Sequence, residues 1–444
     1  MHGSVQIPQR DQVIARDLSK PAATGLVVGV IGIAATAGLG YGAGDHFSHF
    51  GHSMLVATMF FLSICLGALF FTLLQHVTSA GWSVVVRRVA ESMTGALMFL
   101  FPIVLLLIGV PALMKNGFLY DWMAVDAEWV QNNTFIQAKK GYLNGPFLFV
   151  RILIYFAIWI GVARFFTGQS RAQDDDQDPG RTLKMQRAAG ICIILFGLAT
   201  TFAAFDFLMS LNAEWFSTMY GVYFFAGAFW SSLATLALST MWLEKRGQLK
   251  DVVTSEHYHD IGKLMFAFTF FWSYVAFSQF MLYWYADIPE ETHWFNYRMW
   301  GDWTGFSMLL LVGHFAIPML GLLSRHVKRN RKVLAFWCFY VLTFHFIDLY
   351  WNVMPELANG LPGGDPAHAG VPFSAMDLTA MLGVAGIFID AKHRIIISVP
   401  IKCLGRAAKV ECICILRTAA PPLHALDFLL RLARGHLAEL LHEW

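Results

Sequence analysis

The residues of this chain most able to carry chemistry are charged and imidazole side chains inside long apolar stretches. Asp206 stands in FDFLM, Arg151 in LFVRILI, and His345 and Asp348 in FHFIDLYW. A carboxylate inside hydrocarbon costs roughly 2.5–3.5 kcal/mol, so such a residue faces a partner or a water-filled cavity. His345 and Asp348 are three residues apart, which puts them on one helical face. These residues predict a polar site within a membrane.

A quinol matches the chemistry of this set. It needs hydrogen bonds to both ring oxygens and a base that accepts its protons, and a histidine beside an aspartate supplies such a base. The residues expected at one depth, toward the outer surface, are Arg151, Asp206, Gln279, His345 and Asp348. Within this region Gln279, Tyr283 and His345 are the candidates for contact with a quinone.

A simpler interpretation stays open for both pairs. Arg151 and Asp206 would form a buried ion pair, and His345 and Asp348 would share a packing hydrogen bond. That interpretation is less economical for all of them at one depth, because each buried polar group carries its own insertion cost.

A second polar group is predicted toward the inner face. Its side chains would line a proton path from the cytoplasm. Serine and threonine in membrane helices often bond back to their own helix instead, which is the structural alternative. The path residues are Gln75, His76, Ser232, Thr235 and His257.

Metal chemistry has weaker support. The six cysteines show no zinc-type spacing, so no metal site and no disulfide framework are predicted. His76, His314 and His345 are the candidates for a haem ligand, but no helix carries two histidines spaced for stacked haems. A transporter is a further alternative, although its sites are expected at mid-membrane beside broken helices.

Composition places the chain in a membrane. Of 444 residues, 57% are hydrophobic and only 14% are charged, far from the soluble average of about 25% charged. The net charge is +2, and the basic residues are distributed between the apolar runs rather than clustered on one face, so no nucleic-acid partner is predicted. We predict an all-α, multi-pass membrane protein in contact with lipid.

Ten apolar runs are long enough to cross a bilayer. If both termini are cytoplasmic, basic residues gather in the inner loops as expected. The outer loops then carry only Lys115, Lys139, Lys140 and Arg298. The ten predicted spans are 22–40, 54–75, 92–114, 146–166, 188–211, 217–243, 261–285, 305–324, 333–352 and 372–389.

Three regions follow from these spans: a cytoplasmic segment 1–21, a membrane domain 22–389 and a basic, cysteine-containing cytoplasmic tail 390–444. Short connections suit two antiparallel four-helix bundles, formed by spans two to five and six to nine. The outer loops at 115–145, 286–304 and 353–371 are rich in Trp, Tyr, Asn, Gly and Pro, and are interpreted either as docking surface for a partner or as simple interfacial loops.

Five stretches carry a family resemblance. They are FFTLLQHVTSAGWSVVVRRVAE (70–91), FDFLMSLNAEWFSTMYGVYFFAG (205–227), FSQFMLYWYADIPEET (277–292), GHFAIPMLGLLSRHVKRN (313–330) and HFIDLYWNVMP (345–355). With these strings the chain closely resembles the second NrfD-like membrane subunit of alternative complex III, a quinol:cytochrome c oxidoreductase, over residues 20–389.

The resemblance implies two four-helix bundles with two flanking helices in a bacterial inner membrane. It implies partners as well: a sister NrfD-like subunit, a multihaem c subunit, an iron–sulfur subunit and small membrane subunits. Haem c and the iron–sulfur clusters would belong to those partners, and this chain would hold no redox metal. In that family quinol oxidation is assigned mainly to the sister subunit, and this subunit is proposed to take part in proton translocation. Quinone or menaquinone binding here is therefore the second expectation, after a proton-handling role for Asp206, Arg151, His345 and Asp348.

Two other functions remain open: the quinone-binding NrfD-like anchor of a polysulfide-reductase-type molybdoenzyme, and an ion or solute transporter. The tail departs from the family, since residues 390–444 add three cysteines and a leucine-rich stretch at 423–441. Either a surface helix or an altered reading frame near residue 390 explains that change in composition.

Overall fold

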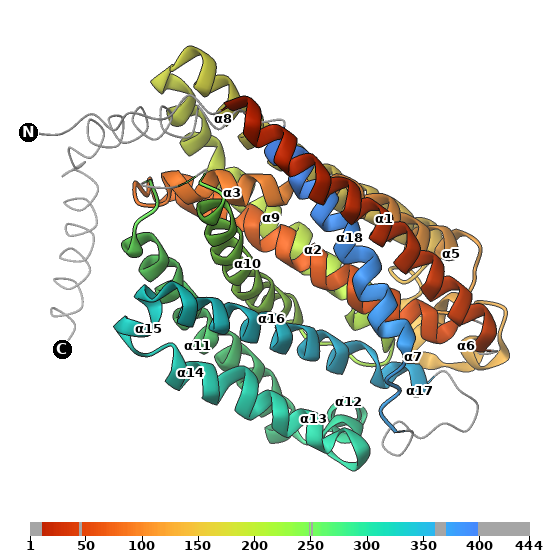
Figure 1. Cartoon of the computed structure of the whole chain (residues 1–444). Helices are drawn as coiled ribbons and strands as arrows, with labels where there is room; N and C mark the ends of the chain where they lie inside the picture. Colours follow the sequence, from red (N-terminus) through yellow and green to blue (C-terminus); the bar gives the residue numbers. More distant parts are fainter. Residues whose placement is uncertain (1–10, 44–46, 248, 250–251, 360–369, 398–444) are drawn as a thin grey trace, which may run out of the picture.

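The computed structural model describes residues 11–43, 47–247, 249, 252–359 and 370–397. Within these ranges the chain is helical and forms no strand (Figure 1). Nine helical segments of the described chain are long and apolar enough to cross a membrane, which confirms a multi-pass membrane protein. They are Ala23–Ala43, Ser48–Val77, Val84–Leu113, Gly145–Asp174, Pro179–Leu211, Tyr220–Lys245, Ser255–Ala286, Gly301–Gly321 and Arg331–Leu357.

The first group of helices packs around α2 (Ser48–Val77), which is buried along most of its length. Against it lie α3 (Val84–Thr94) and the segment α4 (Leu97–Val104), which continues through the π-helical turn Leu105–Gly109 into α5 (Val110–Leu113). The antiparallel pair α8 (Gly145–Asp176) and α9 (Pro179–Phe207) completes this first bundle.

The second bundle contains α10 (Tyr220–Lys245), α11 (Ser255–Ala286) and α16 (Arg331–Val353). Its remaining member runs from α13 (Thr304–Leu309) through the π-helical turn Leu310–Ala316 into α14 (Ile317–Gly321), and the short α15 (Arg325–Arg329) follows. Helix α10 packs against α2 and α9 as well as α11 and α16, so it joins the two bundles.

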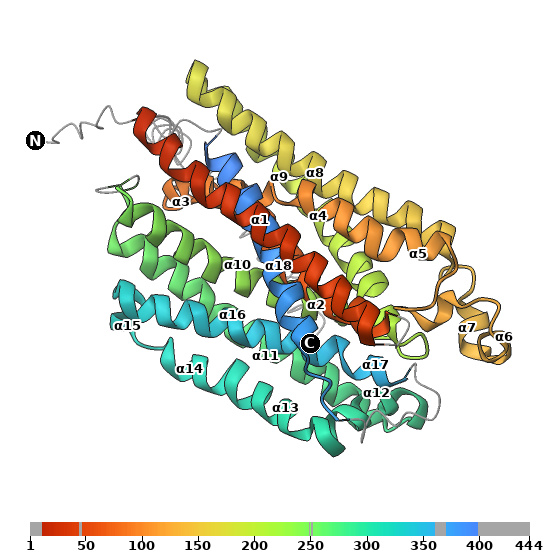
Figure 2. The same cartoon turned by 45° about the vertical axis from the view of Figure 1, so that its right-hand side comes forward.

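Helices α1 (Asp11–Ala43) and α18 (Ala375–Ile397) lie side by side along their length and flank the bundles (Figures 1 and 2). Glycines make this approach close: a Cβ atom added at Gly32 would lie 2.6 Å from the Cα of Gly383, and one at Gly386 would lie 2.4 Å from the backbone nitrogen of Gly29. Small residues allow such backbone contact between membrane helices. Thr36 adds a hydrogen bond to Thr379 at 2.9 Å.

Several sequence boundaries differ from the observed elements. Helix α1 begins at Asp11, inside the predicted N-terminal segment 1–21, of which residues 1–10 lie outside the described residues. The tenth predicted span, 372–389, falls in α18, which continues past residue 390 to Ile397 and includes Asp377, Asp390 and Lys392. The rest of the predicted tail, 398–444, lies outside the described residues.

One end of the molecule, which we call the loop end, contains the connections 114–144, 212–219 and 287–303 together with α17 (Pro355–Asn359) (Figures 1 and 2). Trp122 donates its indole N–H to the carbonyl of Ser210 at 3.1 Å, and Lys139 donates to the carbonyl of Ala213 at 2.6 Å. The Asn212 side chain accepts from the backbone of Trp215 at 3.2 Å and closes the tight turn after α9. These hydrogen bonds tie the connections to one another at the loop end.

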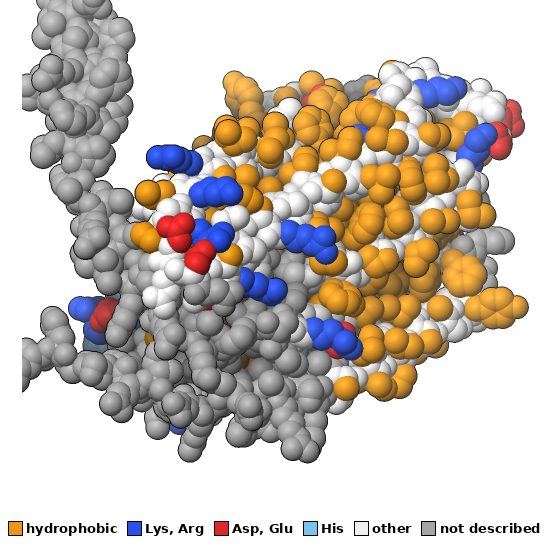
Figure 3. Space-filling view, turned by 90° about the horizontal axis from the view of Figure 1, so that it is seen from above, with side chains coloured by type: hydrophobic (Ala, Val, Ile, Leu, Met, Phe, Trp, Pro, Cys, Tyr) orange, Lys and Arg blue, Asp and Glu red, His pale blue; other side chains and the backbone are white. Residues whose placement is uncertain are grey.

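Exposed apolar side chains cover the flanks of the bundles. Ile191, Ile194 and Leu198 of α9 are 68%, 63% and 55% exposed, which suits a helix face in contact with lipid tails. Figure 3 shows one face of the molecule with a broad apolar surface and with Lys and Arg side chains at its margins.

Candidate functional site

Arg151 and Asp206 form a buried ion pair between α8 and α9. The guanidinium donates from Nε to Asp206 Oδ2 at 2.7 Å and from a terminal nitrogen to Oδ1 at 3.0 Å. The other terminal nitrogen donates to the carbonyl of Tyr142 at 2.9 Å, and the guanidinium lies 3.9 Å from the centre of the Tyr142 ring. Tyr155 donates its hydroxyl to Asp206 Oδ2 at 2.7 Å. Both carboxylate oxygens therefore have partners, as the ion-pair interpretation expects.

His345 lies in α16 and faces α2. Its Nε2 is 2.8 Å from the hydroxyl oxygen of Ser63, and that hydroxyl donates its single hydrogen to the carbonyl of Phe60 at 2.8 Å. Ser63 must therefore accept from Nε2–H, which assigns the proton to Nε2 and leaves a lone pair on Nδ1. That Nδ1 is buried, and no described residue forms a hydrogen bond with it.

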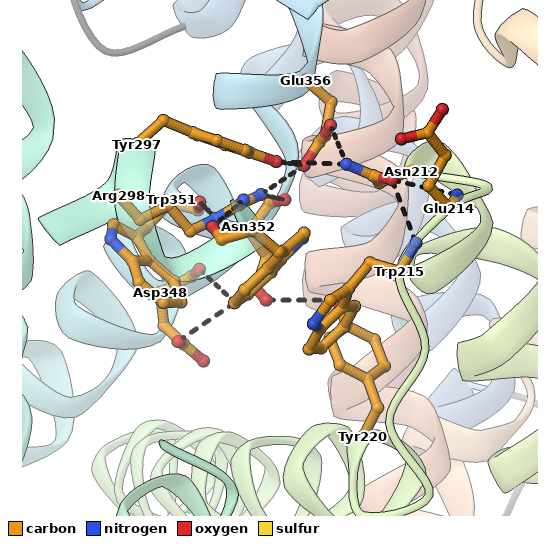
Figure 4. Close-up of polar contacts among 11 residues, drawn as sticks. Asn212, Glu214, Trp215, Tyr220, Tyr297, Arg298, Asp348, Trp351, Asn352 and Glu356 are labelled. Carbon is orange, nitrogen blue, oxygen red and sulfur yellow. Dashed lines mark hydrogen bonds and ion pairs between the residues drawn. The ribbon is translucent and has the colours of Figure 1, made fainter. Parts of the chain in front are cut away.

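Asp348 lies one turn further along α16 and faces α10. The Tyr223 hydroxyl donates to Asp348 Oδ1, and the Asn352 amide donates to the same oxygen at 3.3 Å. Tyr220 in turn donates its hydroxyl to Asn352 Oδ1 at 3.1 Å. Figure 4 shows Asp348, Asn352 and Tyr220 in this chain of contacts. Asp348 was expected to bond His345, but its carboxylate accepts hydrogen bonds from Tyr223 and Asn352 instead.

A second ion pair at the loop end was not predicted. Arg298 is fully buried and donates to Glu356 Oε1 at 2.8 Å and to the carbonyl of Asn352 at 2.9 Å. Its guanidinium lies 3.6 Å from the centre of the Trp294 ring. The Tyr297 hydroxyl also donates to Glu356, and Figure 4 shows these side chains converging on that carboxylate. The available signal was the position of Arg298 among aromatic residues in WFNYRMW, where a loop arginine would otherwise be solvated.

The electrostatics of the loop end include Asp121, in the short helical turn Asp121–Met123. Burial raises the pKa of its carboxyl from the usual 3.8 to about 6, and the negative charge of Glu356 adds to that shift. Burial likewise raises the pKa of Tyr297, with Glu356 acting in the same direction and Arg298 against it. Burial and the charge of Glu356 therefore disfavour further negative charge at the loop end.

A cavity of about 530 Å³ opens between α11, α16 and the segment α13–α14. Most of its walls are aromatic or aliphatic, with Phe277, Phe280 and Leu311 among them. Tyr223 and Asn352, which hold Asp348, form part of its lining. The cavity thus joins an apolar volume to the polar group on α16.

The predicted quinone contacts are distributed unevenly around this cavity. Gln279 lines it and is only 4% exposed, and its side-chain carbonyl oxygen has no hydrogen-bond partner within the described part of the chain. Tyr283 lies outside the lining and donates its hydroxyl to the carbonyl of Phe216. His345 is not among the residues that line the cavity. Gln279 is therefore the one member of the three that reaches the cavity.

The four residues predicted as one proton-handling cluster fall into two groups with different partners. Arg151 and Asp206 bond one another and tyrosines of α8 and its preceding loop, within the first bundle. His345 bonds Ser63 of α2 in the first bundle and Asp348 bonds Tyr223 of α10, so this second pair lies where the two bundles meet. The two pairs, predicted to lie at one depth, have no contact partner in common among these bonds.

The predicted inner path contains residues with local bonds. Ser232 donates to the carbonyl of Phe229 at 2.8 Å and Thr235 to that of Ser231 at 3.0 Å, each within α10. His257 accepts from the Thr254 backbone at 3.1 Å in the capping box of α11. These three follow the structural alternative. Gln75 Oε1 and His76 Nε2 are buried and bond no side chain or backbone group in the described ranges.

A group of charged side chains lies near the predicted inner path. From the sequence, its arginines are predicted only as part of the basic inner loops. Arg88 pairs with Asp174 at 2.7 Å and lies 3.5 Å from Glu91, and it donates to the carbonyl of Ser170 at 3.0 Å. Arg87 lies 3.6 Å from the same Glu91. All of these charges come from α3 and α8, whose ends are buried against one another.

Comparison of the chain with protein-family models and with curated proteins finds no match. The chemistry available to the site is therefore taken from its geometry. An apolar cavity with an unpaired amide oxygen and an adjacent carboxylate–imidazole group can hold an amphipathic ring and receive its protons.

Proposed function

We propose that this chain is an integral membrane subunit of a quinol:cytochrome c oxidoreductase of the alternative complex III type. It would contribute quinol binding and proton transfer in a bacterial inner membrane. The observation that carries the proposal is the 530 Å³ cavity, whose aromatic walls end at Tyr223 and Asn352 beside Asp348. The sequence strings shared with the NrfD-like family support it.

The side chains that line the cavity match the parts of a quinol. The unpaired Gln279 oxygen is an acceptor for one ring hydroxyl, and leaving a buried acceptor unpaired costs about 1–3 kcal/mol. The apolar walls suit the ring and the isoprenoid tail. Tyr223 lines the cavity and donates to Asp348, so it connects the ring to a carboxylate away from lipid.

Oxidation of a quinol releases two protons and two electrons. In this proposal the protons pass through the Tyr223 hydroxyl to the Asp348 carboxylate and to the lone pair of His345 Nδ1. Asp348 and His345 are both buried side chains of α16. The electrons leave to haem c and iron–sulfur clusters of partner subunits. Ten spans with both termini in the cytoplasm belong to the same proposal, with α18 as the tenth crossing.

Substitution of Gln279 tests the binding step. Gln279→Leu keeps the size of the side chain and removes the acceptor, so we expect about a tenfold loss of affinity for a quinol-analogue inhibitor, the effect of one hydrogen bond of about 1.4 kcal/mol. Ser278→Ala is the matched control, because the Ser278 hydroxyl bonds the carbonyl of Val275 on its own helix at 3.0 Å. Equal inhibitor affinity in both variants would reject the cavity as the quinol site.

Purification in mild detergent tests the assignment to a complex. Co-purified c-type haem with quinol:cytochrome c activity supports the proposal. A molybdopterin subunit in its place would identify the chain as a reductase anchor, and a chain without redox partners would favour a transporter.

A further inference from the structure

Three buried side chains of the second bundle face one point. His314, His345 and Asp348 each offer one ligand atom, and these atoms all lie within 4.8 Å of one another. His314 is 0% exposed, His345 1% and Asp348 2%. Two come from α16 and the third from the π-helical turn Leu310–Ala316, so the group forms only when these segments pack together.

The unpaired atoms of this group are nitrogens. Both ring nitrogens of His314 and Nδ1 of His345 are buried and have no hydrogen-bond partner among the residues that the structure describes. At least one nitrogen of each neutral imidazole carries a lone pair. A buried polar atom left unpaired costs about 1–3 kcal/mol, so several in one place indicate a missing partner.

The His314 ring is held in place by two indoles. Its centre lies 3.6 Å from the Trp272 ring and 4.3 Å from the Trp230 ring. Trp230 is itself fixed, because its indole N–H donates to Thr269 at 3.0 Å and to the carbonyl of Met265 at 3.1 Å. Ring orientation is therefore set before any ligand arrives. π-Helical turns inside α-helices are frequent at functional sites.

The other two ligands are oriented by bonds behind them. Ser63 accepts from His345 Nε2–H, which directs the Nδ1 lone pair away from α2. Tyr223 and Asn352 hold Asp348 through Oδ1. A Cβ atom at Gly227 would lie 3.1 Å from His345 Nδ1 and 3.8 Å from Asp348 Oδ2, so these two atoms share the space left by that glycine. Metal ligands are typically held by such second hydrogen bonds.

We propose that His314, His345 and Asp348 bind a divalent transition-metal cation, with Zn²⁺ as the best match. Two imidazole nitrogens and one carboxylate oxygen suit zinc, whereas magnesium and calcium prefer oxygen ligands. Bonds of 2.0–2.2 Å in a tetrahedron place ligand atoms about 3.3–3.6 Å apart, so modest side-chain rotation closes the present spacing. A fourth position remains for water.

The cavity approaches this site and is separated from it by two side chains. Tyr223 and Trp272 line the cavity, and the same two side chains contact Asp348 and His314. The metal site is argued from unpaired nitrogens and does not depend on a quinol. Inhibition of turnover by zinc does rest on the proposed function, because the cation would occupy the His345 lone pair that accepts the proton.

Zinc binding is measured on the full chain with its co-purified partners, after chelator treatment, against a competing zinc-sensitive dye. We expect one tight zinc equivalent. His314→Gln and Asp348→Asn should each weaken it by about 100-fold, and Ser63→Ala by about tenfold through loss of the second hydrogen bond. His76→Gln is the matched control, since His76 is equally buried with an unpaired Nε2 but lies outside this group.

A second measurement needs no variant. X-ray absorption of the zinc-loaded protein should show two imidazole rings and oxygen in the first coordination shell. A shell with thiolate, or with a single imidazole, would overturn the site, and so would equal zinc affinity in the wild type, His314→Gln and Asp348→Asn. Loss of zinc affinity in these variants with quinol turnover unaffected by zinc would support the metal site and count against the proposed function.

Discussion

Removing the Asp206 carboxylate should destabilise the first bundle more than the substitution of any exposed charged residue. The side chain of Asp206 is fully buried and receives both hydrogen bonds of the Arg151 fork together with that of Tyr155. Asp206→Leu leaves the guanidinium in apolar surroundings with only the carbonyl of Tyr142 as hydrogen-bond acceptor. The ion pair bridges α8 and α9, so its loss acts on the packing of the two helices.

The magnitude follows from desolvation. Removing one partner of a buried pair costs about 3–5 kcal/mol, because the remaining charge stays buried without compensation. Replacing both partners, as in Arg151→Met with Asp206→Leu, removes both charges and should recover most of that loss. About 1 kcal/mol should remain, from the Tyr155 hydroxyl that has lost its acceptor.

A double-mutant cycle measures this. The free energy of unfolding of the wild type, the two single variants and the double variant is compared in detergent by titration with a denaturing detergent. Arg181→Gln is the matched control, because Arg181 and Asp176 form an exposed pair at 2.6 Å with side chains 30% and 39% exposed. Exposed pairs contribute only about 0–1 kcal/mol.

The coupling energy decides the outcome. We expect the double variant to be more stable than Asp206→Leu by at least about 2 kcal/mol. If Asp206→Leu were no less stable than Arg181→Gln, the pair would not hold α8 to α9. A structural role in the ion pair would then not explain the buried Asp206 carboxylate, and a role in proton transfer would gain support.

Two further predictions concern the loop end and the flanking helices. Because the pKa of Asp121 is raised to about 6 by burial and by Glu356, its ionisation destabilises the fold as pH rises from about 4 to 6. Asp121→Asn should therefore raise the free energy of unfolding by about 1–2 kcal/mol at pH 8 and hardly at all at pH 4, and an equal gain at both values would contradict this origin. Gly32→Val should lower thermal stability in detergent by about 2 kcal/mol or more, since even its Cβ would lie 2.6 Å from α18 backbone, whereas Gly38→Val, with nothing within 4 Å, should not. Similar losses in both glycine variants would argue against close packing of α1 on α18.

Spans and class of this protein follow from local properties of the chain. A run of apolar residues is long enough to cross a membrane whatever it packs against, so nine of the predicted runs reappear as long apolar helices within the described residues. The cost of a lone buried acid likewise predicted that Asp206 would have a partner, and Arg151 was the cation at matching depth.

Tertiary structure alone decided which polar residues meet. The rotation of each helix about its axis sets the direction of its side chains, and no single stretch of sequence specifies that rotation. Ser232 and Thr235 turned out to bond their own helix, Arg298 of the helix Pro289–Met299 pairs with Glu356, and the π-helical turn carries His314 beside His345. These contacts join residues far apart in the chain, and they depend on packing that only the assembled bundles provide.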